Sequence, residues 1–208
     1  MTIQTYAELK TAIQDWSKRS DTNSLLDTFI DIAEAEMYAN GQESLRIRDM
    51  EVATTGVTSI TTRYMALPTR YLEFRRLKIN LTQGDLRLQF APIDQMRISP
   101  TSGLPKFFTV TSQVEFDRIS DTVYTLGIDY YQSLAPLTAA APTNAILTRF
   151  PTIYLWGSLA ALYQWAVQPD KADYYYTQFL GAIGKANMQD RKGRYGPAPA
   201  IKMEGPTP

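Results

Sequence analysis

The sequence predicts an α+β protein. A helical-bundle core of two N-terminal and two C-terminal helices is expected, with an inserted antiparallel β-rich region and a flexible C-terminal tail. Three observations predict this class: apolar residues recur at helical spacing near both ends, Thr- and Val-rich alternating segments fill the middle, and Pro and Gly accumulate after residue 192. The expected divisions are 1–49 for the N-terminal helices, 50–143 for the β-rich insertion, 144–192 for the C-terminal helices and 193–208 for an extended docking tail.

Two amphipathic helices are expected in the N-terminal division. Thr5 and Glu8 have the spacing of a capping box, in which the Thr hydroxyl and the Glu carboxylate each accept from a free backbone N–H. The first helix then carries an apolar stripe of Tyr6, Leu9, Ile13 and Trp16. The second begins near Ser24, and its apolar face consists of Leu26, Phe29, Ile30, Ala33 and Met37. Another face of this helix is acidic and consists of Asp27, Asp31 and Glu34.

Six or seven short, mostly antiparallel strands are expected in the middle of the chain. Residues 50–68 are rich in Thr and Val and are expected to form two strands around a break at Gly56. A strand over 71–81 is followed by turn residues, so the segment 86–91 is expected to return as its hairpin partner. Further strands are expected near 107–111, 113–116 and 123–131, and a single helical turn over 92–97.

An uncharged segment, residues 150–169, predicts a helix that is covered nearly all round, because its apolar run 153–167 has only Ser158 and Gln164 as polar side chains. That run spans about 22 Å at ~1.5 Å per residue, which is short for a bilayer, so protein cover is expected. The cover is either the rest of one globular domain or, in part, neighbouring subunits. Contact with a neighbour is favoured by small residues and interface-type aromatic residues: Gly157, Ala160 and Ala161 with Tyr154, Trp156, Tyr163 and Trp165.

A final helix is expected from Asp170, as its N-cap, to about Arg191. Its apolar face consists of Ala172, Tyr175 or Tyr176, Phe179, Ile183 and Ala186. Basic residues gather where this helix meets the tail, namely Lys185, Arg191, Lys192 and Arg194. The helix dipole favours cations at this end, so the cluster is interpreted either as dipole partners or as docking residues.

Composition narrows the function classes. The 208 residues include no Cys and no His, which excludes disulfide frameworks, Cys-rich zinc sites, thiol nucleophiles and His-based triads. Acid–base chemistry near neutral pH would fall to carboxylates, Lys or Tyr. Residues 1–49 carry five Lys or Arg against nine Asp or Glu, whereas residues 146–208 carry seven against four. Opposed ends favour head-to-tail contacts between like subunits, although solvated faces explain them too.

Two charged groups in the β-rich region are candidates for chemistry or binding. The densest carboxylates are Glu115, Asp117, Asp121 and Asp129. Acids on short strands normally face solvent, so neither a glycosidase pair nor a calcium loop is favoured, and no metal or cofactor is predicted. The basic patch consists of Arg63, Arg70, Arg75, Arg76 and Lys78, against Glu73 alone. It fits phosphates or an acidic protein surface, and a solvated strand face is the simpler interpretation.

Three blocks of the chain, in this order, resemble the head–tail adaptor (head-completion or connector) proteins of tailed bacteriophages, most closely those of short-tailed phages. The first contains TYAELKTAIQDWSKRSD at 5–21 and LLDTFIDIAEAEM at 25–37. The second contains LPTRYLEFRRLKIN at 67–80, SGLPKFFTV at 102–110 and YTLGIDYYQSL at 124–134. The third contains FPTIYLWGSLAALYQWA at 150–166 and YYTQFLGAIGKANMQDRKGRYG at 175–196. These are core and turn patterns, and together they span nearly the whole chain.

The resemblance implies a structural virion protein without catalytic residues or cofactors, made in the host bacterial cytoplasm and located at the neck of the virion. Such adaptors form a homo-oligomeric ring, usually a dodecamer, between the portal protein and the tail. The ring seals the packaged DNA, which passes through without specific recognition, and offers a platform for nozzle or tail-tube proteins.

On this interpretation three sets of residues have expected roles. Portal docking is assigned to Lys185, Arg191, Lys192, Arg194 and Tyr195. The subunit interface is assigned to Tyr154, Trp156, Gly157, Ala160, Tyr163 and Trp165. The channel lining is assigned to Asp27, Asp31 and Glu34. The main alternative function is a carbohydrate- or host-surface-binding tail module that uses the β-rich insertion and its tyrosines. A carboxylate hydrolase of the same particle is a third.

Overall fold

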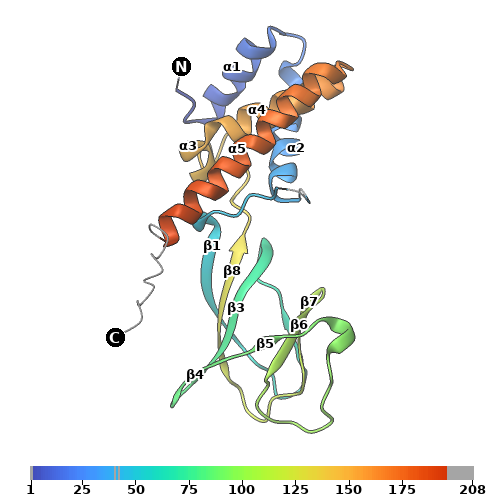
Figure 1. The fold of residues 1–208 in the computed structure, drawn as a ribbon, viewed down its shortest axis with the longest axis vertical. Coiled ribbons are helices and arrows are strands. Elements are labelled where there is room, and N and C mark those ends of the chain that lie inside the picture. The colour runs from blue at the N-terminus through green and yellow to red at the C-terminus, as the bar shows by residue number, and fades with distance from the viewer. Residues whose placement is uncertain (1, 40, 42, 196–208) are drawn as a thin grey trace, which may run out of the picture. The chain divides into compact units, whose positions relative to one another are not determined.

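The computed structural model describes residues 2–39, 41 and 43–195, and of residues 194 and 195 the backbone only. The chain forms two compact units: a helical unit, made of the residues up to Asp49 and those from Ala135 onward, and a β unit, Met50–Leu134. The α+β class predicted from the sequence is confirmed (Figure 1). The β-rich part therefore ends nine residues before the expected boundary at 143, because the segment that follows Leu134 hydrogen-bonds to the helices. In this segment the Pro142 carbonyl accepts from the backbone N–H of Tyr6 at 2.7 Å.

The helical unit begins with α1, Tyr6–Ser17, whose predicted capping box is confirmed. The backbone N–H of Glu8 donates to the Thr5 hydroxyl at 3.3 Å, while the Glu8 carboxylate accepts from the Thr5 N–H at 3.0 Å. α1 ends at Ser17, because the next residue, Lys18, takes a left-handed conformation with φ 55°, so Lys18 and Arg19 lie beyond the helix. α2, Leu26–Ala39, follows a short 3₁₀ turn, Asn23–Leu25.

The C-terminal helices are α3, Ala145–Arg149, α4, Pro151–Trp165, and α5, Pro169–Tyr195. The Asn144 side chain caps α3 by accepting from the backbone N–H of Leu147 at 2.9 Å. Pro151 stands at the start of α4, where its missing N–H would have had no helical partner. α5 begins at Pro169, so Asp170 lies in its first turn rather than at its cap.

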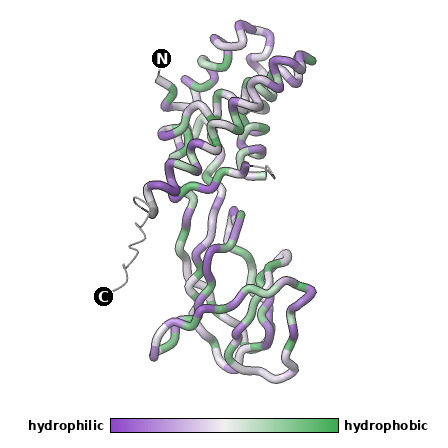
Figure 2. Tube along the Cα trace, viewed as in Figure 1, coloured by the Kyte–Doolittle hydropathy of each residue, from purple (hydrophilic) through white to green (hydrophobic). Residues whose placement is uncertain are grey.

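α4 lies at the centre of the helical unit, and α1, α2, α3 and α5 all pack against it (Figure 1). Ten of its fifteen residues are buried, from Ile153 to Tyr163. Figure 2 shows that α5, in contrast, interleaves hydrophilic and hydrophobic residues, as a helix with one exposed face does. Within the described residues, no helix combines the length and apolar character that crossing a membrane requires.

The tail was expected to begin at residue 193, but Gly193, Arg194 and Tyr195 belong to α5. A single glycine costs a helix only about 1 kcal/mol relative to alanine, so Gly193 does not end α5. The rest of the expected tail, residues 196–208, lies outside the described residues.

The β unit contains two four-stranded sheets with the strand orders β1-β8-β3-β4 and β2-β7-β6-β5. The strands of the first are β1, Glu51–Val57, β3, Tyr71–Leu81, β4, Gly84–Arg87, and β8, Thr125–Gln132. Those of the second are β2, Tyr64–Ala66, β5, Gln89–Phe90, β6, Phe107–Val110, and β7, Gln113–Phe116. The sequence predicted six or seven strands, and the described residues contain eight, because the return segment after β3 divides into β4 and β5.

Pairing in the β unit is antiparallel except between β5 and β6, which are parallel. Gly56 does not break β1 but lies within it, opposite Leu126 of β8. A 3₁₀ turn, Ile93–Gln95, occupies the position of the expected helical turn. Alternate residues of both sheets meet in one apolar core, which includes Leu77, Ile79, Phe108, Val114, Phe116, Leu126 and Ile128.

Candidate assembly surfaces

The cover of the apolar helix α4 comes from within the chain. A Cβ atom at Gly157 would lie 2.8 Å from the Ala33 Cβ on α2 and 2.9 Å from the Phe179 ring on α5. Real Cβ atoms do not approach so closely, so this glycine allows α2 and α5 to pack against α4. The small residue that the sequence assigned to a subunit interface therefore serves packing inside the subunit.

The aromatic residues of α4 divide into buried and accessible ones. Tyr154 is fully buried, and its hydroxyl accepts from Asn144 Nδ2 at 2.7 Å and donates to Glu34 Oε1 at 2.9 Å. Tyr163 is also buried and stacks on Tyr175, with ring centroids 5.3 Å apart. Trp165 stays 49% exposed.

The predicted interface set is thus largely internal. Tyr154, Gly157, Ala160 and Tyr163 are covered by their own chain, and Trp156 is half-buried between Trp16 and Tyr175. Of this set, Trp165 keeps the most exposed side chain. The sequence alone did not reveal this because an all-apolar helix looks the same whichever protein surface covers it.

Glu34 is not available to line a channel, which corrects the assignment made from its sequence position. Its carboxylate is buried and accepts from the Leu137 backbone N–H and from the Tyr154 hydroxyl, both at 2.9 Å. Burial raises the pKa of Glu34, and the two hydrogen bonds oppose that shift. Glu34 therefore anchors the segment that leads from the β unit into α3.

The other two acids of that set remain at the surface. Asp31 is exposed, whereas Asp27 is paired with Lys10 at 2.5 Å and accepts from the Tyr6 hydroxyl at 2.6 Å. The Lys10 ammonium and the Tyr6 hydroxyl hold the pKa of Asp27 below its usual range. Burial and the Asp27 hydrogen bond raise the pKa of Tyr6.

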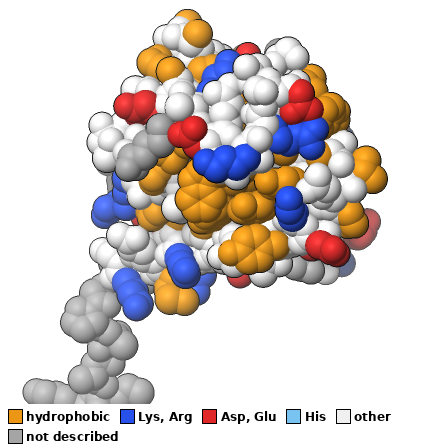
Figure 3. Space-filling view, turned by 90° about the horizontal axis from the view of Figure 1, so that it is seen from above, with side chains coloured by type: hydrophobic (Ala, Val, Ile, Leu, Met, Phe, Trp, Pro, Cys, Tyr) orange, Lys and Arg blue, Asp and Glu red, His pale blue; other side chains and the backbone are white. Residues whose placement is uncertain are grey.

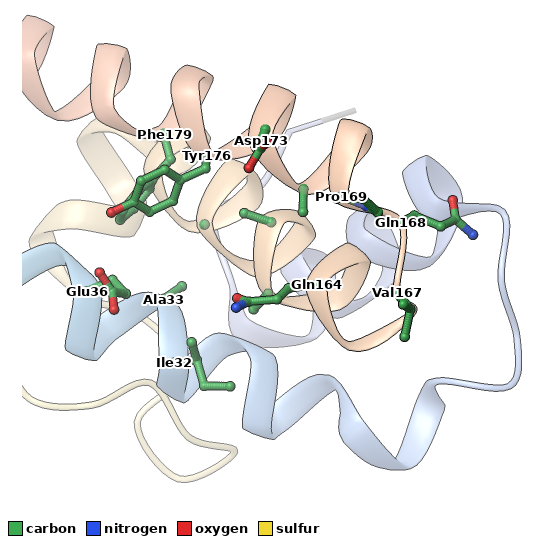
Figure 4. Close-up of a pocket in the computed structure, with 14 residues that line it drawn as sticks. Ile32, Ala33, Glu36, Gln164, Val167, Gln168, Pro169, Asp173, Tyr176 and Phe179 are labelled. Carbon is green, nitrogen blue, oxygen red and sulfur yellow. The ribbon is translucent and has the colours of Figure 1, made fainter.

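An apolar groove of about 540 Å³, which the sequence analysis missed, lies in the helical unit between α2 and α5. Figure 4 shows Ile32 and Glu36 on the α2 side, Asp173 and Tyr176 on the α5 side, and Gln164 of α4 between them. Its floor is formed by Gly157, Ala160 and Ala161. Small side chains on α4 keep the groove open. The groove could not be predicted from the sequence, because it depends on how three helices are placed in space.

Exposed apolar side chains also gather elsewhere on the helices. Figure 3 shows hydrophobic side chains beside Lys and Arg on the face of the helical unit turned toward the viewer. Trp16 of α1 is 50% exposed and Tyr174 of α5 is 60% exposed. The Arg19 guanidinium lies 5.7 Å from the centre of the Trp165 ring, and the Lys171 ammonium lies 5.0 Å from that of Tyr163. Aromatic residues with nearby cations are typical of protein–protein interfaces.

The basic patch predicted in the β unit is neutralised by acids from other strands. Arg63 pairs with Glu115 at 2.8 Å, Arg76 with Asp129 at 2.6 Å and Lys78 with Asp85 at 2.5 Å. Arg75 pairs with Glu51. The remaining member, Arg70, is exposed and has a left-handed backbone with φ 56°. The patch is therefore mostly a set of cross-strand ion pairs rather than a free cationic surface.

The carboxylates considered for chemistry have structural partners as well. Asp117 is buried, accepts from the backbone N–H groups of Lys106 and Phe107, and pairs with Arg118 at 2.9 Å. Asp121 accepts from the Tyr124 hydroxyl at 2.8 Å. Among the residues that the structure describes, no group of three or more carboxylates could hold a metal ion.

The basic residues near the C-terminus occupy the last three turns of α5. Lys185, Arg191 and Lys192 are exposed. Arg194 and Tyr195 belong to the same helix, and their side chains lie outside the described part of the chain. In the β unit, Phe90, Ile93, Ile98 and Phe107 form an exposed apolar cluster, and Phe90, Ile98 and Phe107 also line a second hollow of about 450 Å³.

These surfaces are typical of a protein that assembles with other proteins. An apolar groove, exposed aromatic residues and exposed helical charges are the features that such proteins share. The family model of the SU10 adaptor protein matches residues 4–202, so the chain belongs to that family and is a structural adaptor protein of a bacteriophage. This confirms the resemblance to phage adaptors and implies contacts with other proteins of the virion. No curated protein matches the chain.

Proposed function

We propose that the chain is a head–tail adaptor that forms a homo-oligomeric ring, a dodecamer as the resemblance implies, between the portal and the tail of a short-tailed phage. The ring closes the vertex after DNA packaging and carries the tail proteins. The observation that carries this proposal is the match of the adaptor family over residues 4–202, nearly the full chain. The surfaces of the two units support it.

The helical unit is suited to form the ring. Because α4 is sealed by its own chain, a subunit can fold before it assembles, and its outer helices remain free for neighbours. Asp31 of α2 is an exposed carboxylate that would repel DNA if this helix faces the channel, whereas Asp27 is paired with Lys10. Such repulsion lets DNA pass without specific contacts.

The C-terminal segment is suited to the portal. Arg191 and Lys192 are exposed at the end of α5, and residues 196–208 add four Pro and two Gly. A sequence with this composition has little tendency to pack on its own and can become ordered on a partner. The exposed apolar cluster of the β unit is the corresponding candidate for contact with tail proteins.

Electron microscopy of the full chain mixed with its portal protein tests the function. A ring of adaptor density on the portal vertex is the expected result, and subunits are counted from its symmetry. The oligomeric state of the free chain does not test the function, because an adaptor can be monomeric until it binds the portal. A chain that ignores the portal and instead binds glycans would overturn the proposal in favour of a host-surface-binding module.

Deletion of residues 196–208 tests the docking segment. Because α5 ends at Tyr195, the truncated chain keeps every described helix and is expected to melt at the same temperature as the full chain. Its attachment to the portal in a pull-down is expected to weaken by at least about tenfold, since an extended segment contributes through many small contacts. Equal attachment of the two chains would remove the portal role of the segment.

A further inference from the structure

The groove between α2 and α5 has a charged rim without ion pairs in the described part of the chain. Glu36 stands on the α2 wall and Asp173 on the α5 wall, and both side chains are exposed (Figure 4). Between them the groove is apolar, with Ile32 43% exposed. An apolar floor between two carboxylates fits a partner that presents an apolar side chain beside a cation.

One end of the groove carries a residue whose conformation and exposure are both unfavourable in an isolated subunit. Val167, in the turn between α4 and α5, has φ 55° and is 83% exposed. Glycine is the usual residue at such a helix end, because a β-branched side chain is strained in the left-handed region. A covering partner would give this exposed side chain an apolar contact.

The outer face of α5 presents the complementary pattern. Gly181, Lys185 and Met188 follow one another at spacings of four and three residues, so they form a single outer strip. Met188 is 59% exposed, and Lys185 is exposed with no ion pair in the described residues. A Cβ atom at Gly181 would meet nothing within 4 Å in its own chain. A glycine inside an exposed helix is unfavourable unless another backbone approaches closely.

We propose that the groove between α2 and α5 binds the outer strip of α5 from a second copy of the chain. Met188 enters the apolar groove beside Val167, Lys185 pairs with Asp173 on the rim, and Gly181 allows the close approach of the two helices. The proposal rests on the ring proposed above and names the contact that holds neighbouring subunits.

The two surfaces make the contact compatible with a ring. The groove and the outer strip are different patches, so each subunit offers one to each neighbour, and such heterologous contacts generate rings when the rotation closes. The charges also discourage a two-fold dimer, because groove against groove brings Glu36 and Asp173 together with their own copies. The strip lies before Arg191, which leaves the end of α5 free for the portal.

Charge reversal tests the proposed Asp173–Lys185 pair, with ring assembly on the portal as the assay. Asp173→Lys and Lys185→Asp each place like charges across every subunit contact, and each variant is expected to need at least about tenfold more protein to complete the ring. In an equal mixture, a ring in which the two variants alternate has opposite charges at every contact, so the mixture is expected to assemble far better than either variant alone. The melting temperature of each free variant shows that its fold is intact.

A disulfide gives an independent readout, because the chain has no cysteine of its own. Positions 173 and 185 are twelve residues apart on one helix, about 18 Å, too far for a disulfide within one chain. The variant with both Asp173→Cys and Lys185→Cys is therefore expected to give a ladder of linked subunits when it is oxidised on the portal. Either cysteine alone links at most two subunits, which provides the control.

Val167→Gly separates folding from assembly. The substitution relieves the left-handed strain, so the melting temperature of the free chain is expected to rise by about 2–4 °C, while ring formation weakens because the apolar contact is lost.

The outcomes separate this proposal from the function on which it rests. If the wild-type chain forms a ring and both charge variants form it equally well, with no ladder from the double-cysteine variant, the groove contact is wrong and the adaptor function stands. If the wild-type chain forms no ring on its portal, the adaptor function fails, and the groove contact fails with it.

Discussion

The strand β3 and the helix α5 are the longest elements of their units, and they use charge in opposite ways. On β3, Arg75, Arg76 and Lys78 each pair with an acid from another strand. On α5, Asp173, Lys185, Arg191 and Lys192 are exposed and have no ion pair within the described residues. Cross-strand pairing neutralises these three cations of β3, whereas α5 keeps exposed charges without such partners. We therefore expect the assembly contacts at exposed, unpaired charges beside apolar residues, as on α5, rather than at the paired cations of β3.

The largest effect on stability is expected at Gly157, which lies between packed helices. Gly181, on the outer face of α5, provides the comparison. Gly157→Val would force methyl groups into the Ala33 and Phe179 contacts and is expected to lower the free energy of unfolding by about 3 kcal/mol. The same substitution at Gly181 meets open space and is expected to change it by less than about 0.5 kcal/mol. Urea titration of both variants gives the comparison. Equal losses would show that Gly157 is not a packing residue.

An intermediate effect is expected at Glu34. Glu34→Ala leaves the Leu137 N–H and the Tyr154 hydroxyl without this acceptor in a buried site, which is expected to cost about 2 kcal/mol in the free energy of unfolding. Glu34→Gln keeps an acceptor oxygen and is expected to cost much less.

The pH dependence of these variants provides a second readout. Burial raises the pKa of Glu34 above that of the unfolded chain, so its contribution to stability is fully present below the unfolded pKa and is lost as the pH rises through the folded pKa. Thermal melts of the wild type should show this decline, and Glu34→Gln should lack it. An identical pH profile for the two proteins would contradict the assignment.

Local signals in the sequence identified the elements well, because each depends on neighbouring residues. The Thr5–Glu8 capping box and the strand over 71–81 were both predicted at their observed positions. The assignment of Glu34 was wrong because it shares its helical face with Asp27 and Asp31 in sequence, while the segment 135–143 that buries it lies a hundred residues away. The predicted basic patch failed for the same reason, since strand register decides which acid meets Arg76, and the sequence does not show register.

The groove between α2 and α5 shows a further limit of sequence reasoning. From the sequence, its small residues Gly157, Ala160 and Ala161 were expected to favour contact with a neighbour, and Gly157 and Ala160 were assigned to the subunit interface. In the structure, Gly157 packs against other helices of its own chain, and the three residues together form the floor of the groove. Periodicity places residues on one helix, but a groove is a property of three helices and of the side chains that fail to fill the space between them.

The smallest effect is expected from the ion pairs of β3. Arg76 pairs with Asp129, and the two side chains are 52% and 28% exposed, so solvent screens their attraction. Arg76→Ala is expected to lower the free energy of unfolding by at most about 1 kcal/mol, and less as salt is added, because exposed pairs offset little more than the entropy of ordering two side chains. Lys185→Ala is expected to leave unfolding unchanged and to weaken only assembly on the portal. Urea titrations at low and high salt, followed by portal pull-downs, compare the two cations directly. If Arg76→Ala weakens attachment to the portal while Lys185→Ala does not, the contrast between β3 and α5 is reversed, because a paired charge would then serve the partner and an unpaired one would not.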